Sequence, residues 1–289
     1  MDIHGLYVPL VTPFAADGSV DLAALERLAV EVLDGGADGL VALGTTGEPA
    51  TLDAAERHAV IDTCARACRG APLVVGAGSN DTRRSVEALR ELGKWPQVSA
   101  ALVPVPPVTR PTEDGVVAHF TELATASPVP LLVYNIPYRT GLVLSERALR
   151  ALAALPGVVG VKQAVGCVDA TTVALLADPP PGFAVLAGDD PYAAPMLALG
   201  GAGAILASAH LATNRFAAMV GAWRRGDAVA GRAVAAPLSG LSAALFAEPN
   251  PTVLKGVLHA LGRIATPDVR LPLLPASPAA VRAALDLVP

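Results

Sequence analysis

The side chain best suited to covalent chemistry in this 289-residue chain is Lys162, one of three lysines. It follows the apolar run Val158–Val161, which has the composition of a buried strand. Burial disfavours the ammonium form of an amine, and a free amine can attack a ketone to form a Schiff base. The alternative is a lysine that reaches past the strand end into water. Lys94 follows a predicted surface helix, and Lys255 lies on a predicted C-terminal helix.

Two adjacent threonines, Thr45 and Thr46, follow the apolar segment Gly39–Ala42. Their hydroxyls, exposed backbone N–H groups and the N-terminus of the helix expected next all favour negative charge. The turn Gly44–Glu48 is therefore suited to a carboxylate. A tight turn in which a threonine serves as a local cap is the alternative.

Two further side chains follow the apolar segment Leu131–Tyr134. The Tyr134 phenol could relay protons, although a buried tyrosine with a single hydrogen bond is equally common. Arg139 offers a planar fork for the carboxylate of a second substrate, and a structural ion pair is its alternative role. An amine, a carboxylate cradle and a phenol at one mouth would suit imine formation followed by deprotonation next to the imine carbon.

Other classes of site and partner are disfavoured by what the sequence lacks. The five histidines are scattered without metal-ligand spacing, so we expect no metal. Neither a complete glycine fingerprint nor a Walker-type run is present, so we expect no cofactor. A formal net charge of −5 without a Lys/Arg cluster argues against nucleic acid and anionic membranes as partners.

These side chains need a scaffold that brings strand ends together. Apolar runs of strand length recur up to about Arg225, and runs without polar alternation are typical of a parallel sheet covered by helices. Eight such units of roughly 28 residues fit a closed (β/α)8 TIM barrel, whose functional groups sit at the carboxyl ends of the strands. An open doubly wound sheet is the alternative, but Thr12-Pro13-Phe14 stands where its glycine fingerprint belongs. The expected strands are Leu6–Val11, Gly39–Ala42, Leu73–Ala77, Ala100–Val103, Leu131–Tyr134, Val158–Lys162, Ala184–Ala187 and Ala204–Ala207.

Amphipathic helical patterns lie between these strands and after the last of them. We predict a barrel domain at residues 1–225 and a C-terminal helical domain at residues 226–289. Asn250-Pro251 is typical of a helix start, with a capping asparagine before a proline. The helical patterns include Leu22–Leu33, Ala54–Ala67, Arg83–Leu92, Glu113–Thr125, Ser145–Ala154 and Ala193–Leu199, followed by Asp227–Leu245, Thr252–Leu261 and Pro278–Leu287.

The expected location is the cytoplasm. The N-terminus has neither a basic segment nor an apolar one, which predicts no secretion signal. Three cysteines form a sparse, odd set that suits a reducing compartment. The uncharged stretch Tyr192–Thr213 contains a proline and three glycines, which predicts a helix, a turn and a strand rather than a membrane span.

Several ordered motifs resemble the dihydrodipicolinate synthase / N-acetylneuraminate lyase family along nearly the whole chain. The resemblance implies a (β/α)8 barrel lyase that works through a Schiff base, usually as a tetramer. The motifs are Gly5 with Val11-Thr12-Pro13-Phe14, Gly44-Thr45-Thr46-Gly47-Glu48, Tyr134-Asn135-Ile136-Pro137, Gly160-Val161-Lys162, Gly188-Asp189-Asp190 and Glu248-Pro249-Asn250-Pro251 with Lys255.

The resemblance also implies roles for single residues. Lys162 would hold pyruvate as an imine, and Tyr134 would pass the proton. Thr45 and Thr46 would meet the pyruvate carboxylate and the proton path. Two further residues, Gly188 and Ile205, would line the pocket through backbone atoms.

The double threonine, the Arg139-Thr140 pair and the segment Glu248–Pro251 are closer to the dihydrodipicolinate synthase branch. In that branch the arginine grips the carboxylate of aspartate semialdehyde. The implied reaction condenses pyruvate with L-aspartate 4-semialdehyde to give hydroxy-tetrahydrodipicolinate for lysine biosynthesis. The implied assembly is a homotetramer built as a dimer of dimers.

Two positions depart from the pattern of that branch. Val108 stands where the family places a tyrosine that a neighbouring subunit lends to the proton relay, and valine cannot move a proton. Tyr138, where many synthases have serine, offers another hydroxyl. In lysine-inhibited members a site near the subunit interface uses histidine and acidic side chains. Asn80 fits it but Ala54, Arg57 and Arg84 do not, so we predict insensitivity to lysine.

Two alternatives to the synthase follow. The missing tyrosine at position 108 favours a paralogous 2-keto acid aldolase or dehydratase that uses a different aldehyde, such as a sugar acid. A non-catalytic relative that binds a keto acid is disfavoured, because Lys162, both threonines, Tyr134 and Arg139 are all present.

Overall fold

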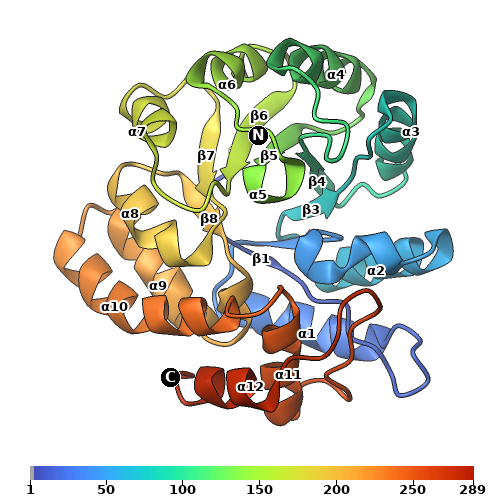
Figure 1. Cartoon of the computed structure of the whole chain (residues 1–289), viewed down its shortest axis with the longest axis vertical. Coiled ribbons are helices and arrows are strands. Elements are labelled where there is room, and N and C mark those ends of the chain that lie inside the picture. Colours follow the sequence, from blue (N-terminus) through green and yellow to red (C-terminus); the bar gives the residue numbers. More distant parts are fainter. Residues whose placement is uncertain (1–2) are drawn as a thin grey trace.

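Eight parallel strands close into a barrel in the order in which they occur in the chain, and the eighth pairs with the first. The structure is a computed structural model that describes residues 3–289. Helices surround the barrel (Figure 1), so the expected (β/α)8 TIM barrel is confirmed. The strands are β1 Gly5–Pro9, β2 Gly39–Ala42, β3 Leu73–Gly76, β4 Val98–Pro104, β5 Leu131–Asn135, β6 Val158–Gln163, β7 Ala184–Ala187 and β8 Gly203–Ile205.

Most of the α-helices begin where a short polar side chain caps them. Asp53 shows the pattern most fully, because its side chain accepts from the backbone N–H of Glu56 while Glu56 accepts from that of Asp53. The α-helices are α1 Leu22–Asp34, α2 Ala54–Ala67, α3 Thr82–Leu92, α4 Glu113–Ala126, α5 Pro137–Thr140, α6 Glu146–Ala153, α7 Ala170–Ala177, α8 Ala193–Ala198, α9 Thr213–Arg224, α10 Ala228–Leu245, α11 Thr252–Ala260 and α12 Pro278–Leu285. The short 3-10 helices are η1 Thr45–Gly47, η2 Pro49–Thr51, η3 Asp190–Tyr192 and η4 Ala207–His210.

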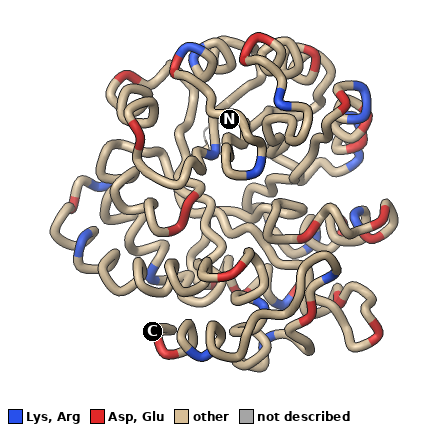
Figure 2. The backbone as a smooth tube through the Cα atoms, in the orientation of Figure 1, with Lys and Arg blue, Asp and Glu red and all other residues tan. Residues whose placement is uncertain are grey.

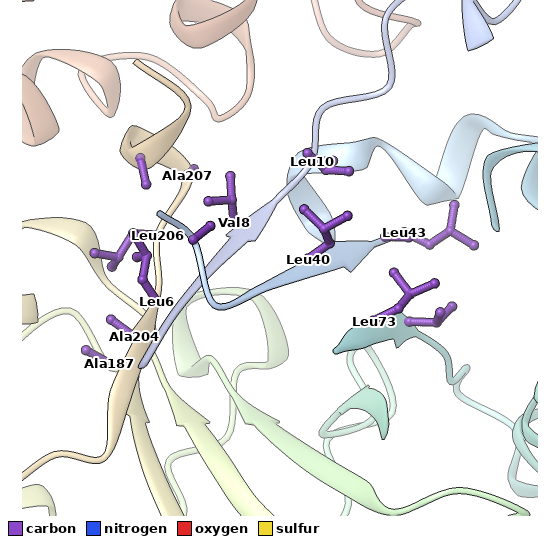
Figure 3. Close-up of a cluster of buried hydrophobic side chains, with 14 of the residues drawn as sticks. Leu6, Val8, Leu10, Leu40, Leu43, Leu73, Ala187, Ala204, Leu206 and Ala207 are labelled. Atoms are coloured by element: carbon purple, nitrogen blue, oxygen red, sulfur yellow. The ribbon is translucent and has the colours of Figure 1, made fainter. Parts of the chain in front are cut away.

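Buried side chains form two clusters, one on each face of the closed sheet. Leu6, Val8 and Leu40 belong to the larger cluster, which packs the outer strand faces against the helices (Figure 3). Tyr7 points the other way and belongs to the smaller cluster inside the barrel. The interior is so tight that a Cβ atom at Gly39 would lie 2.4 Å from the Tyr7 ring. Burial on both faces explains why the strands read as continuous apolar runs.

The predicted elements differ from the observed ones mainly at their ends. The strand expected at Leu6–Val11 is Gly5–Pro9, and the one expected at Ala204–Ala207 ends at Ile205. Helices α7 and α9 were not among the predicted patterns. The uncharged stretch Tyr192–Thr213 forms α8, β8 and η4, as predicted from its proline and glycines.

The chain after β8 and α9 continues as the three helices α10, α11 and α12 (Figure 1). Helix α10 packs against α8, α9 and α12. Among residues 3–289 it is the one helix long and apolar enough, by length and composition, to cross a membrane, a test that core helices also pass. It carries Arg232 and has Pro237 within it. Basic and acidic residues are interspersed over the outer helices (Figure 2).

Candidate active site

A cavity of about 930 Å³ is lined by residues from the carboxyl ends of the barrel strands and from the loops that follow them. This is the end of the barrel at which functional groups gather in this fold. All seven of the site residues expected from the sequence line it. They are Thr45, Thr46, Tyr134, Arg139, Lys162, Gly188 and Ile205.

Lys162 is placed by β6 and is buried, with 6% of its surface exposed. In the β5–β6 register it pairs with Tyr134, and its Nζ lies 4.4 Å from the centroid of the Tyr134 ring. The alternative of a lysine that extends into bulk water is therefore wrong. The other two lysines differ, since Lys94 is exposed and pairs with Glu91 whereas Lys255 is fully buried against Glu48.

Gly188 follows β7 and leaves room for the lysine stem. A Cβ atom at this position would lie 2.8 Å from Cγ of Lys162. Ile205, the last residue of β8, is 1% exposed and packs in the same interior cluster as Tyr134. Tyr134 of β5 and Gly188 after β7 therefore both border the Lys162 side chain.

The segment Gly44–Gly47, which we call the threonine turn, lies between two residues in the left-handed backbone region, Leu43 with φ of 54° and Glu48 with φ of 53°. Such conformations are costly for residues other than glycine and persist where surrounding contacts hold them. Neither threonine caps a helix, because the N-cap of η1 is Gly44 without a side-chain bond. Thr46 is buried and its hydroxyl accepts from Nδ2 of Asn250 at 3.0 Å.

The expected contribution of a helix N-terminus to this turn is wrong. Helix α2 begins at Ala54, beyond the intervening η2, and the side chain of its N-cap residue Asp53 accepts from the N–H of Glu56. An anion bound at this turn would instead meet the hydroxyls and backbone of Thr45 and Thr46. Gly76 allows the turn to approach β3, since a Cβ atom there would lie 2.0 Å from the carbonyl oxygen of Leu43.

Arg139 lies on the single turn of α5, next to the exposed Tyr138. Its guanidinium carbon is 5.6 Å from the centroid of the Tyr138 ring. None of the ion pairs found among residues 3–289 includes Arg139, so its alternative role in a structural ion pair receives no support there. The fork remains available for an anionic group that enters the cavity.

Two acidic side chains at the cavity had no role assigned from the sequence. Burial raises the pKa of Asp190 to about 6, although its carboxylate accepts from the backbone N–H of Ser208 at 2.6 Å. Burial also raises the pKa of Asp189, which accepts from Gly166 N–H at 2.6 Å. Both residues belong to the motif Gly188-Asp189-Asp190 that follows β7, in which only the glycine has a role predicted from the sequence.

Asn250 corrects another expectation. We predicted that its side chain caps the following helix, but α11 has no side-chain cap and its N-cap residue is Pro251. The side chain points instead to the threonine turn and lines the cavity. Val108 is 83% exposed and does not line the cavity of its own chain, so it differs from the family tyrosine only in having no hydroxyl to lend to a neighbouring subunit. Tyr138 does line it.

Cys64 and Cys68 are buried on or next to α2. Burial raises the pKa of the Cys64 thiol to about 12. Within residues 3–289 no group of three or more His, Cys, Asp or Glu residues is arranged to hold a metal ion.

Comparison with known proteins covers almost the entire chain. The model of the "Dihydrodipicolinate synthetase family" matches residues 2–287. The chain belongs to this family. A curated relative from Neisseria gonorrhoeae, named 4-hydroxy-tetrahydrodipicolinate synthase, is 37% identical over 287 residues, which cover 98% of each chain. One of the same name from Moorella thermoacetica is 40% identical over 272 residues, covering 93% of this chain and 91% of the relative.

Solved structures of the family superimpose closely on this barrel. The chloride-inhibited dihydrodipicolinate synthase of Acinetobacter baumannii, complexed with pyruvate, has a TM-score of 0.94 at 34% identity and 99% coverage of both chains. The enzyme of Cyanidioschyzon merolae with lysine bound has a TM-score of 0.92 at 31% identity, covering 98% of this chain and 96% of that one.

Proposed function

We propose that the protein is a 4-hydroxy-tetrahydrodipicolinate synthase that condenses pyruvate with L-aspartate 4-semialdehyde. The observation that carries the proposal is Lys162, buried at a cavity of about 930 Å³ and 4.4 Å from the Tyr134 ring. The names of the full-length relatives support the choice of reaction. The pyruvate complex of the relative from Acinetobacter baumannii supports the choice of keto acid.

In the proposed reaction the free amine of Lys162 attacks the ketone carbon of pyruvate, and water leaves to give an imine. Loss of a methyl proton then gives an enamine, whose carbon attacks the aldehyde of the second substrate. Hydroxyls of Thr45 and Thr46 bind the pyruvate carboxylate, and Tyr134 carries protons between the lysine adduct and the cavity. The backbone of Gly188 and Ile205 borders the reacting carbon atoms.

Arg139 is proposed to bind the carboxylate of the aldehyde. It sits on α5 at the cavity without a partner of its own among the ion pairs of residues 3–289, and a guanidinium can hold a carboxylate through two parallel hydrogen bonds.

Homotetrameric assembly and a cytoplasmic location are further proposals. Size-exclusion chromatography with light scattering tests the assembly, and a monomer in solution would contradict it.

A second candidate function is a 2-keto acid aldolase or dehydratase that uses a different aldehyde. Val108 favours it, because this exposed side chain has no hydroxyl for the proton relay of a neighbouring subunit. Steady-state assays with L-aspartate 4-semialdehyde and a panel of sugar-acid and aromatic aldehydes separate the two candidates. The synthase is supported if the semialdehyde gives the highest kcat/KM.

Pyruvate trapping separates both enzymes from a keto-acid-binding relative without chemistry. Purified protein is incubated with pyruvate and borohydride, and its intact mass is measured. We expect one adduct per wild-type chain and none in Lys162→Ala. An unlabelled wild-type chain, or a labelled Lys162→Ala chain, would refute the proposed Schiff base.

A further inference from the structure

A buried ion pair joins the C-terminal helices to the threonine turn. Nζ of Lys255, on α11, lies 2.8 Å from Oε1 of Glu48, and the two side chains are 0% and 2% exposed. Nζ also lies 4.0 Å from the centroid of the Phe14 ring. Burial lowers the pKa of Lys255 from its usual value. Since a buried ion pair is often no more stabilising than an apolar pair of the same volume, stability alone is a weak reason for this arrangement.

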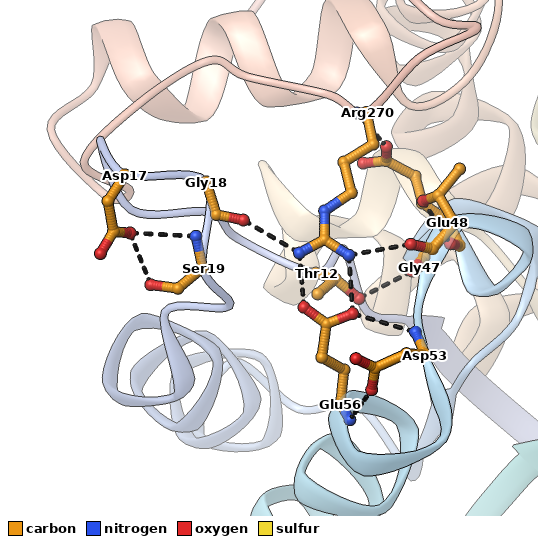
Figure 4. A network of polar contacts seen from close by, with 10 residues as sticks. Thr12, Asp17, Gly18, Ser19, Gly47, Glu48, Asp53, Glu56 and Arg270 are labelled. Carbon is orange, nitrogen blue, oxygen red and sulfur yellow. Dashed lines mark hydrogen bonds and ion pairs between the residues drawn. The ribbon is translucent and has the colours of Figure 1, made fainter.

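The same carboxylate is held from its other side. Oε2 of Glu48 accepts from the backbone N–H of Arg270 at 2.9 Å. Arg270 is itself fixed by two hydrogen bonds to the carboxylate of Glu56 and by others to the carbonyl oxygens of Thr51 and Gly18 (Figure 4). Each oxygen of Glu48 therefore has one donor from the C-terminal segment, although 207 residues separate Glu48 from Lys255.

Glu48 directly follows the threonine turn and has a backbone conformation that needs support from surrounding contacts. Its φ of 53° is in the left-handed region, and it directly follows η1, the helix that contains both threonines. Asn250 adds a further contact by donating to the hydroxyl oxygen of Thr46. Because that oxygen accepts from Asn250, its own hydrogen remains free to donate toward an anion in the cavity.

We propose that Lys255 and Glu48 are positioning residues for the keto acid. Their ion pair holds the turn Gly44–Gly47 in the strained form in which the threonine hydroxyls and N–H groups meet the pyruvate carboxylate. Lys255, which does not line the cavity, thus sets the affinity for pyruvate from the C-terminal helical segment. This inference rests on the proposed function, in which the threonine turn binds pyruvate.

The test compares the loss of one partner with the loss of both. Lys255→Met leaves the Glu48 charge buried without its ammonium partner, so this variant should lose stability as well as pyruvate affinity. The double variant Glu48→Met/Lys255→Met replaces the pair by two apolar side chains of similar volume, so it should be more stable than Lys255→Met, although the backbone N–H of Arg270 loses its acceptor. The double variant still lacks the ion pair that holds the threonine turn, so its pyruvate affinity should stay low.

Arg263→Met is the matched control. Arg263 also joins the C-terminal segment to the barrel through an ion pair, with NH2 2.8 Å from Oε2 of Glu31 on α1, but it does not line the cavity. Each variant is titrated with pyruvate under borohydride trapping and measured by intact mass, and its Tm is measured by circular dichroism. The control should half-saturate at the wild-type pyruvate concentration.

We expect the double variant to need about tenfold more pyruvate for half-saturation, which corresponds to losing one hydrogen bond to a charged group. Wild-type half-saturation in a folded double variant would overturn the inference, because affinity would then follow stability alone. If Lys255→Met does not fold, the pyruvate concentration at which the double variant half-saturates tests the inference on its own. A wild-type chain that traps no pyruvate would instead refute the proposed function, so the two failures are distinguishable.

Discussion

Replacing Gly188 with alanine tests whether the Lys162 amine must lie where the structure places it. The new Cβ atom would lie 2.8 Å from Cγ of Lys162, 2.9 Å from Cβ of Ala164 and 3.0 Å from the carbonyl oxygen of Gln163. Non-bonded carbon atoms pack at roughly 3.5–4.0 Å, so all three contacts are too short and these groups must move away by roughly 0.5–1 Å. The flexible lysine stem yields before the backbone of β6 does.

The expected effect is on the reaction more than on folding. A displacement of about 1 Å can reduce the rate of a positioned reaction by about 100-fold. Overpacking of this kind typically costs about 1–3 kcal/mol, which a folded barrel can tolerate. The initial rate of borohydride-trapped pyruvate adduct, followed by intact mass, should therefore fall by about 100-fold in Gly188→Ala while circular dichroism still shows a cooperative melt.

Gly240→Ala provides a matched control on α10. The nearest atoms to a Cβ at that position are the terminal methyl groups of Leu287 at 3.9 Å, an ordinary contact distance. This variant should trap pyruvate at the wild-type rate. A folded Gly188→Ala protein that also reacts at the wild-type rate would show that the position of the lysine stem is not critical.

The remaining predictions concern the second substrate, pH and regulation. Arg139→Ala should leave pyruvate trapping unchanged but lower kcat/KM for L-aspartate 4-semialdehyde by about 10-fold or more, as expected for a lost charged hydrogen bond; an unchanged kcat/KM would remove its assigned role. Because burial raises the pKa of Asp190 from 3.8 to about 6, the stability that this carboxyl contributes is present below pH 3.8 and is lost as the pH rises through 6. Relative to Asp190→Asn, the wild-type free energy of unfolding in urea should therefore fall by about 2 kcal/mol between pH 4 and pH 7, and parallel pH curves would contradict this. Lysine should not inhibit the purified enzyme, because Arg84 would repel its ammonium group; inhibition by sub-millimolar lysine would show otherwise.

The barrel could be predicted from local patterns, whereas Gly188 and Ile205 were named only through the family resemblance, and the roles of the seven candidate residues stay predictions. Buried parallel strands leave continuous apolar runs, and the fold itself brings their carboxyl ends to one mouth. Lys162 and Tyr134 end neighbouring strands, so pairing in register was enough to place them together. Helix α7 was missed, since its apolar and threonine-rich sequence has little helical periodicity.

The support of the site could not be predicted in the same way. Lys255 and Glu48 are 207 residues apart in the sequence, and no local sequence pattern at either residue identifies the other as its partner. Asn250 precedes a proline and therefore matched a helix cap, but tertiary structure uses its amide on Thr46. The acidity of Asp190 depends on burial that the sequence does not display. The division into domains at residues 1–225 and 226–289 stays a prediction.

The central claim is that one amine, at the end of β6, forms the covalent bond to the keto acid. Proteolysis of the borohydride-reduced pyruvate adduct, followed by tandem mass spectrometry, identifies the modified lysine directly. All three lysines can be distinguished, since Lys94, Lys162 and Lys255 lie in separate parts of the chain. We predict the adduct on Lys162, and its appearance on Lys94 or Lys255, or on no lysine, would contradict the account.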